Sequence, residues 1–156
     1  MNIRRATQSD IPSLNRLLHQ VLMVHHNGRP DLFKPDCTKY TDDELKVLLQ
    51  DPEKPVFAAF DEDGAMLGYA FCQIETYAGD NIMTDRKTLY IDDICVDEHS
   101  RGQHVGTALY RHVTAFAKEI GCYHVTLNVW SCNPDAAAFY EAMGMKPYKV
   151  GMETIL

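Results

Sequence analysis

The sequence contains no long run of apolar residues. A membrane span needs roughly 18 or more such residues in a row, and no segment approaches that length. The opening stretch, MNIRRATQSD, also lacks the apolar core of a secretion signal. These two absences predict a soluble cytoplasmic protein with no membrane contact.

Paired cysteines and spaced metal ligands are missing as well. The five cysteines are odd in number, widely scattered and without a C-x-x-C pair, which argues against a disulfide framework and a zinc knuckle. Cys72 and Cys95 lie in apolar runs, where a cysteine usually serves as a small buried hydrophobic residue. His25 and His26 are adjacent, but no further ligands follow at a suitable spacing, so we predict no metal site.

Positive charge is also scarce. The formal net charge is −7, and no cluster of Lys and Arg extends beyond short pairs. Nucleic acid is therefore a poor candidate partner. An acidic surface suits a cationic substrate such as an amine, but it is also common among cytoplasmic proteins. Charge alone leaves the substrate open.

The sequence does contain enough apolar material for one folded core. With 156 residues, of which 46% are hydrophobic, the chain fits a single domain over residues 1–156. In the first half, periodicity and turn residues predict a short strand, two helices separated by a long loop, and an antiparallel hairpin. The predicted elements are a strand at 2–6, a helix capped by Ser9 or Asp10 with Pro12 in its first turn, a loop at 25–41, a helix near 42–50, and strands at 55–61 and 66–77.

The second half alternates strands and helices. The predicted elements are a strand at 88–96, an amphipathic helix that ends at Gly121, a strand at 122–130, a helix starting near Asn133 and a last strand at 146–156. A strand, a helix and a second strand in succession predict a right-handed crossover and a parallel pair. The loop after Val96 then lies at the carboxyl end of a central strand, where α/β sheets tend to bind ligands.

The stretch VDEHSRGQHVGTAL, residues 96–109, has the features of a diphosphate site. Backbone N–H groups at the start of a helix attract anions, Gly102 permits a positive φ, and Gly106 permits close approach. Arg101 can neutralise a phosphate, and Thr107 can donate a hydroxyl hydrogen bond. The same glycines also fit an ordinary turn with close helix packing, so the stretch alone leaves both interpretations open.

The region from Leu89 to Tyr148 as a whole resembles the GCN5-related N-acetyltransferase superfamily. The resemblance rests on three linked features: the Arg101 loop after a central strand, a helix start at Asn133, and Phe139-Tyr140 in that helix. It implies a single-domain α/β fold. The sheet would be mixed and mostly antiparallel, with a parallel pair splayed at the cofactor site and helices on both faces.

The resemblance also implies that the cofactor is acetyl-CoA. Main-chain N–H groups from Gln103 to Thr107 would bind its pyrophosphate, and the backbone of Ile94 to Val96 would pair with the pantetheine arm. Asn133 would hydrogen-bond the cofactor, and Tyr140 would lie near its sulfur. The sequence departs from the family pattern at His104, where a glycine is expected; the N–H remains, but a Cβ and an imidazole are added. The implied cofactor-binding residues are Ile94, Cys95, Val96, Arg101, Gly102, Gln103, His104, Val105, Gly106, Thr107, Asn133 and Tyr140.

Acetyl transfer to an amine needs a base, because a protonated amine cannot attack. In similar small-amine acetyltransferases an acidic residue matches the position of Asp92, so we select Asp92, with Asp93 and Glu75 as alternatives. Strand residues alternate between faces, so only one of Asp92 and Asp93 points into the cleft unless a bulge re-aims them. The competing interpretation is structural: one aspartate caps a backbone group or pairs with a nearby Lys or Arg.

The remaining steps also have candidate groups. A phenol can protonate the leaving thiolate, which makes Tyr140 the candidate acid; without the resemblance, a core aromatic beside Phe139 would be the better interpretation. A backbone N–H near Ile94 or Cys95 is the candidate for stabilising the oxyanion.

We therefore expect an acetyl-CoA-dependent N-acetyltransferase that acts on a primary amine of a small molecule or peptide. The loops at 24–35 and 77–87 would select the substrate. A catalytically weak acyl-CoA-binding sensor or interaction module of the same fold is the alternative, and a nucleotide-binding protein that uses the same glycines is a third. A carboxyl-terminal strand can mediate dimers in similar folds, so a homodimer is one assembly that we consider.

Overall fold

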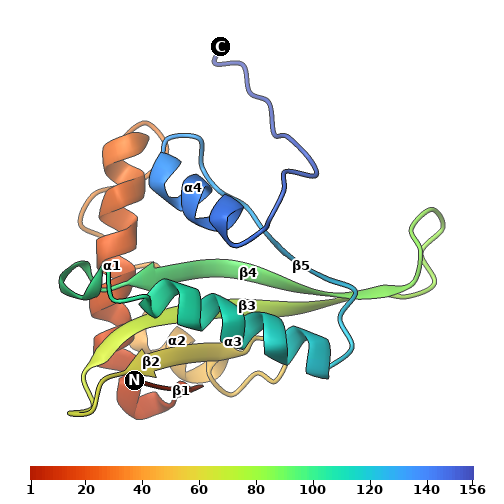
Figure 1. The fold of residues 1–156 in the computed structure, drawn as a ribbon. Helices are drawn as coiled ribbons and strands as arrows, with labels where there is room; N and C mark the ends of the chain where they lie inside the picture. The colour runs from red at the N-terminus through yellow and green to blue at the C-terminus, as the bar shows by residue number, and fades with distance from the viewer.

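A five-stranded sheet forms the centre of the computed structural model, which describes residues 1–156. The strands lie in the order β1-β2-β3-β4-β5, and all neighbours are antiparallel except β4 and β5, which are parallel (Figure 1). The mixed sheet agrees with the fold class that the sequence predicts. The strands are β1 (Asn2–Arg5), β2 (Val56–Phe60), β3 (Met66–Tyr77), β4 (Arg86–Val96) and β5 (His124–Leu127).

Helices cover both faces of the sheet. On one face, α1 (Ile11–Gly28) and α2 (Asp42–Leu48) bury leucines such as Leu14 and Leu45 in one core cluster. On the other, α3 (Val105–Glu119) buries Leu109 and Val113 in a second cluster. The fourth helix, α4 (Pro134–Ala142), lies above β4 and β5 and buries none of its residues fully. None of these helices combines the length and the apolar character needed to cross a bilayer.

Helix α1 is longer than predicted. It begins at Ile11 after Asp10 with Pro12 in its first turn, as the sequence indicates, but it continues to Gly28. The prediction that the loop starts at His25 was therefore wrong. Both histidines lie in the last helical turn, where a histidine side chain suits the helix dipole.

Strand β5 is shorter than the predicted 122–130. It pairs with β4 only from Thr88 to Ile91, and β4 bulges at the next residue, Asp92. Because the bulge bends β4 away from the ladder, residues 128–130 leave the sheet instead of extending it. The two parallel strands therefore separate after Ile91, and β4 continues from Asp92 to Val96 without β5 beside it.

The predicted last strand at 146–156 was wrong. These residues form no regular structure and make no backbone hydrogen bond. The segment leads away from α4 and ends far from the sheet (Figure 1). Its apolar side chains stand at alternate positions, as in a strand, but they are exposed; Val150 is 77% and Met152 90% accessible. The alternation is real, but no strand of this chain pairs with it.

Candidate active site

A β-bulge in β4 brings two neighbouring carboxylates to one point. Asp92 is the extra residue of the bulge, because Ile91 and Asp93 pair with consecutive residues of β3. The bulge interrupts the alternation of side chains between the two faces. Both carboxylates therefore approach one ammonium group, since Nζ of Lys39 lies 2.8 Å from Oδ2 of Asp92 and 3.9 Å from Oδ2 of Asp93.

Asp93 is the more deeply buried of the two acids. Its side chain is 9% exposed, whereas that of Asp92 is 38% exposed. Burial raises the pKa of Asp93 to about 6, while the charge of Lys39 and a hydrogen bond from Tyr69 oppose the rise and the charge of Asp92 adds to it. A carboxyl group with such a pKa can take up a proton near neutral pH.

Helix α4 places a phenol close to this acid. Burial raises the pKa of Tyr140 above the ordinary value for tyrosine, and the negative charge of Asp93 raises it further. Tyr140 therefore keeps its proton at neutral pH. The helix begins where predicted, because the side chain of Asn133 accepts a hydrogen bond from the backbone N–H of Ala136 at 3.2 Å.

The loop between β4 and α3 has free backbone donors. The N–H groups of residues 103–107 make no hydrogen bond within the protein, as expected at a helix start. Gly102 has a φ of +77°, and His104 adopts the left-handed conformation with a φ of +60°. A side chain at position 104 is thus accommodated, and α3 begins at Val105 with its donors open to an anion.

An ion pair fixes this loop to α1. The carboxylate of Asp97, directly after β4, pairs with Arg16 of α1 and accepts a hydrogen bond from the backbone N–H of His99 at 3.0 Å. Asp97 is 5% exposed although it is charged. Burial alone would raise its pKa, but Arg16 and the His99 N–H together lower it, so the carboxylate stays ionised.

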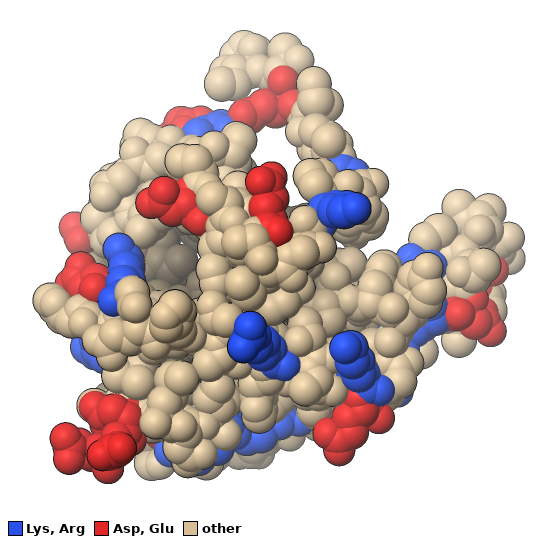
Figure 2. Space-filling view, viewed as in Figure 1, with Lys and Arg blue, Asp and Glu red and all other residues tan.

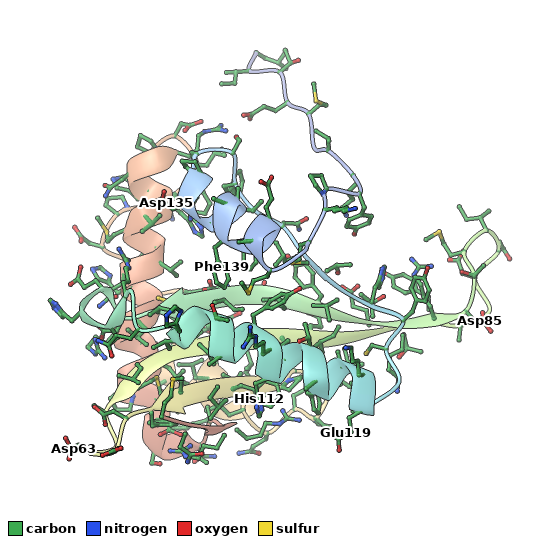
Figure 3. All side chains as sticks on the ribbon, viewed as in Figure 1. Asp63, Asp85, His112, Glu119, Asp135 and Phe139 are labelled. Atoms are coloured by element: carbon green, nitrogen blue, oxygen red, sulfur yellow. The ribbon has the colours of Figure 1, made fainter.

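Two glycines allow close packing around the loop. A Cβ at Gly106 would lie 3.4 Å from the ring of Phe139 and from Cγ2 of Val96, so this position brings α3 close to α4 and β4. Figure 3 shows Phe139 pointing from α4 toward the sheet. At Gly68 a Cβ would lie 2.6 Å from the carbonyl oxygen of Cys95, a distance that no side chain tolerates.

The last part of β4 has a free edge. From Asp92 onward β4 pairs only with β3, because the pairing with β5 ends at Ile91. The backbone of Ile94 to Val96 can therefore accept an extended ligand on that side. A hollow opens in the molecular surface between α1 and α4, beside the end of β4 (Figure 2).

The cysteine in this part of β4 is a packing residue, as predicted. Cys95 is 7% exposed, and its Sγ donates a hydrogen bond to the carbonyl oxygen of Leu17 at 3.6 Å. Burial raises the pKa of its thiol to about 12. The thiolate is the nucleophilic form of cysteine, so Cys95 is unreactive at neutral pH.

A cavity borders Tyr140. It has a volume of about 880 Å³ and is bordered by α3, β5, α4 and residues 144–151. Tyr110, Asn128 and Tyr148 contribute to its wall together with Tyr140. One side of it is the edge strand β5, which has no strand partner beyond β4.

Some predicted residues lie outside the carboxylate cluster. Glu75 pairs with Thr88 at the far end of the β3–β4 ladder and accepts a hydrogen bond from Tyr77 at 3.2 Å. His26 contacts the carbonyl oxygen of Phe33 at 2.7 Å, which fits a role in ending α1. No group of three or more His, Cys, Asp or Glu side chains has an arrangement that could hold a metal ion.

Other residues of the site were missed by sequence reasoning. Lys39 comes from an irregular loop and Tyr69 from the middle of β3, and neither belongs to a motif with a recognisable spacing. Gly68 did carry a signal, because a glycine inside a strand often marks a close backbone approach. Its partner could not be named without the register of the sheet.

Comparisons with known proteins agree with this geometry. The acetyltransferase (GNAT) family model matches residues 22–145. This chain belongs to the acetyltransferase (GNAT) family. A solved structure of a mutant Bacillus halodurans protein is 30% identical, with a TM-score of 0.96 over 100% of this chain and 99% of the other. A putative acetyltransferase from Agrobacterium tumefaciens is 25% identical, with a TM-score of 0.76 over 100% of both chains.

Curated GNAT relatives are similar over shorter regions. Streptothricin acetyltransferase of Streptomyces lavendulae is 32% identical over 95 residues, which are 61% of this chain and 46% of the relative. A probable glucosamine 6-phosphate N-acetyltransferase of Oryza sativa subsp. japonica is 28% identical over 109 residues, which are 70% of this chain and 58% of the relative. The chain thus spans about half the length of these two relatives.

Proposed function

We propose that this protein transfers the acetyl group of acetyl-CoA to a primary amine. The observation that carries the proposal is the buried Asp93 carboxyl, whose pKa of about 6 lets it accept a proton at neutral pH. It lies on the strand that leads into an anion-binding helix start, in a chain of the GNAT family. Acetyl-CoA supplies an acyl group that is activated as a thioester.

The residues around the loop fit this cofactor. The free N–H groups from Gln103 to Thr107 would hold its pyrophosphate, with Arg101 nearby to balance charge. The unpaired edge of Ile94, Cys95 and Val96 would bind the pantetheine arm as a strand binds its neighbour. The N–H groups of residues 103–107 have no hydrogen-bond partner in the protein, and residues 94–96 of β4 have a partner strand on the β3 side only.

The acids have different tasks in this proposal. Asp93 accepts the proton of the amine, because its Oδ1 accepts no hydrogen bond from the protein while Oδ2 is held by Tyr69 at 2.9 Å. Asp92 attracts and orients the ammonium group, since it is more exposed and ion-paired. This assignment exchanges the first and second choices that the sequence suggests, because burial separates the two acids and sequence spacing does not.

Tyr140 donates the proton to the leaving thiolate. The ionised Asp93 raises the pKa of Tyr140, so proton uptake by Asp93 removes the charge that opposes proton loss from the phenol. Deprotonation of the amine therefore prepares the acid for its step. The two groups work in sequence and return to their starting states by exchanging protons with solvent.

The acceptor is proposed to be an amine of a small molecule or a peptide. The two curated relatives are named for streptothricin and glucosamine 6-phosphate, which are small molecules. The negative net charge of the chain suits a cationic acceptor. A panel of primary amines, with CoA release and acetylated product both measured, tests this proposal. Binding of acetyl-CoA without product from any amine would favour the sensor alternative instead, which the ion pair of Lys39 with Asp92 also fits.

We also propose that two copies associate through residues 146–156. Tyr148, Val150 and Met152 stand at alternate positions of this segment and are exposed. The edge of β5 and the cavity beside it offer an unpaired strand and an apolar wall. An exposed strand edge readily accepts another strand, so the segment of one copy would pair with β5 of the other and cover Tyr140.

A further inference from the structure

The ammonium group of Lys39 occupies the position that an acceptor amine needs. Lys39 belongs to the irregular loop between α1 and α2, and its Nζ lies 2.8 Å from Asp92 and 3.9 Å from Asp93. The ring centroid of Tyr40 is 5.6 Å from the same atom, within the range of a cation–π contact. Two carboxylates and one aromatic ring therefore surround a primary ammonium.

The carboxylates of Asp92 and Asp93 together favour the binding of a single cation. Burial alone would lower the pKa of Lys39, but the charges of Asp93 and Asp92 raise it above the ordinary value. The ammonium in turn holds the pKa of Asp93 below the value that burial alone would give. A second ammonium at the same carboxylates would be repelled by the first, so an acceptor can bind only after Lys39 leaves.

Lys39 can leave without any movement of the backbone. Its side chain has four rotatable bonds and is 37% exposed, and rotamer changes of such side chains take picoseconds to nanoseconds. The neighbouring residues stay anchored, because the ring of Tyr40 stacks on Phe71 at 5.9 Å and Thr41 caps α2. The exchange of one ammonium for another is therefore a local event.

We propose that Asp92, Asp93 and Tyr40 form the ammonium subsite of the acceptor, and that Lys39 fills this subsite in the free protein as a built-in competitor. The inference rests on the proposed function. It specifies the acceptor class as a primary alkylamine in its protonated form, whose ammonium lies at the end of a flexible aliphatic chain, as in lysine itself. The amine replaces Lys39 and then loses a proton to Asp93.

Removing the competitor should make the acceptor bind more tightly. Lys39→Met keeps the length of the side chain and removes its charge, and Lys39→Arg keeps the charge. At pH 8.5 we expect the KM for a primary alkylamine, such as Nα-acetyl-lysine amide, to fall roughly tenfold in Lys39→Met. In that variant no lysine side chain competes with the acceptor for the subsite. Lys39→Arg should keep a high KM. Lys46→Met, which removes an exposed lysine of α2 paired with Asp43, is the matched control.

The pH profile provides a readout that a purely structural role would not change. The groups that act on Asp93 are Lys39 from the loop, Asp92 on its own strand, Tyr69 from β3 and Tyr140 from α4. In Lys39→Met the acid limb of kcat/KM should move to higher pH, because kcat/KM reports the free protein. The acid limb of kcat should stay at its wild-type position, because in the complex the acceptor has already replaced Lys39.

Calorimetry of amine binding without acetyl-CoA separates this inference from the proposed function. Tighter amine binding by Lys39→Met than by wild type supports the subsite even where no acetyl transfer occurs. A higher KM and weaker binding in Lys39→Met would show that Lys39 contacts the acceptor, and the inference would be wrong. Equal binding by both proteins would also overturn it, since the ion pair would then compete with nothing. Failure of acetyl transfer alone, with the expected binding order, would refute only the proposed chemistry.

Discussion

The phenol of Tyr69 donates a hydrogen bond of 2.9 Å to Oδ2 of Asp93 across the β3–β4 pairing. Tyr69 is fully buried, and its own pKa is raised by burial and by the charge of Asp93. The bond fixes one carboxylate oxygen and leaves Oδ1 without a partner in the protein. A buried acid that is oriented but not neutralised by its neighbours is suited to accept a proton from a ligand.

Replacing this acid should stabilise the protein at high pH. The pKa of Asp93 rises from an ordinary value near 4 to about 6 on folding. Above pH 6 Asp93 is ionised in both states, and its burial in the folded state lowers the free energy of unfolding. This destabilisation disappears as the pH falls from about 6 to about 4, because the folded protein takes up the proton first. We expect Asp93→Asn to raise the free energy of unfolding by up to about 3 kcal/mol at pH 8 and to change it little at pH 4. Urea unfolding at both pH values measures this.

The exposed Asp63, in the turn between β2 and β3 (Figure 3), provides the control for that measurement. Asp63→Asn should leave stability nearly unchanged at both pH values. A lower free energy of unfolding for Asp93→Asn than for the wild type at pH 8 would contradict the prediction. It would show that the ion pair of Asp93 with Lys39 stabilises the fold by more than the burial of Asp93 destabilises it.

The phenol of Tyr140 should matter for turnover and not for cofactor binding. Tyr140→Phe removes only the hydroxyl group, so packing in α4 is retained. We expect kcat to fall by about 10²-fold, the usual size of a lost general acid, with an unchanged dissociation constant for acetyl-CoA. Steady-state kinetics and calorimetry measure the two quantities. Wild-type turnover in this variant would make Tyr140 a packing residue.

The histidine in the loop before α3 should contribute to phosphate binding through its side chain. His104 adopts a left-handed conformation that glycine adopts without strain, so His104→Gly should fold normally. We expect CoA to bind about tenfold more weakly, the loss of one charge-assisted hydrogen bond. If His104 contacts the pyrophosphate, the variant should bind both CoA and dephospho-CoA, which lacks the 3′-phosphate, more weakly than the wild type does. Equal or tighter binding in the variant would mean that the backbone N–H groups alone hold the ligand.

Much of the fold follows from local patterns in the sequence. The spacing of the apolar residues correctly located α1, α3 and the β2–β3 hairpin. Gly121 and Asn133 correctly marked the end of α3 and the start of α4, because helix caps and stop signals act within a few residues. The segment at 146–156 was assigned wrongly for the opposite reason. Alternating apolar residues indicate that a segment can form a strand. A strand also needs the free edge of another strand to pair with, and the presence of such an edge depends on the whole fold.

The candidate site was partly predictable for the same reason. The loop at 101–107 is recognisable from its glycines at the start of a helix. The choice between Asp92 and Asp93 depends on burial and on a bulge, which sequence spacing does not reveal. Lys39 reaches the acids from a loop 53 residues earlier in the chain than Asp92, and no local pattern predicts such a contact.

The segment at 146–156 should control assembly. We expect the protein to be a dimer at micromolar concentration by light scattering, and Val150→Asp together with Met152→Asp to make it monomeric, because burying two unpaired charges is strongly unfavourable. Lys34 is exposed in the loop between α1 and α2 and does not line this cavity, so Lys34→Asp should leave the dimer intact. A monomeric wild-type protein at such concentrations would rule out this assembly.

The pH dependence of kcat/KM for acetyl transfer to a primary alkylamine, with the acetylated product identified by mass spectrometry, tests the role of Asp93 most directly. We predict an acid limb that reflects the pKa of Asp93, which burial raises to about 6. Asp92→Asn should keep this limb, at slightly lower pH, because the charge of Asp92 raises the pKa of Asp93. Asp93→Asn should lose the limb and at least about 10²-fold of the activity. An Asp93→Asn variant with wild-type activity and an unchanged acid limb would contradict the assignment of Asp93 as the base.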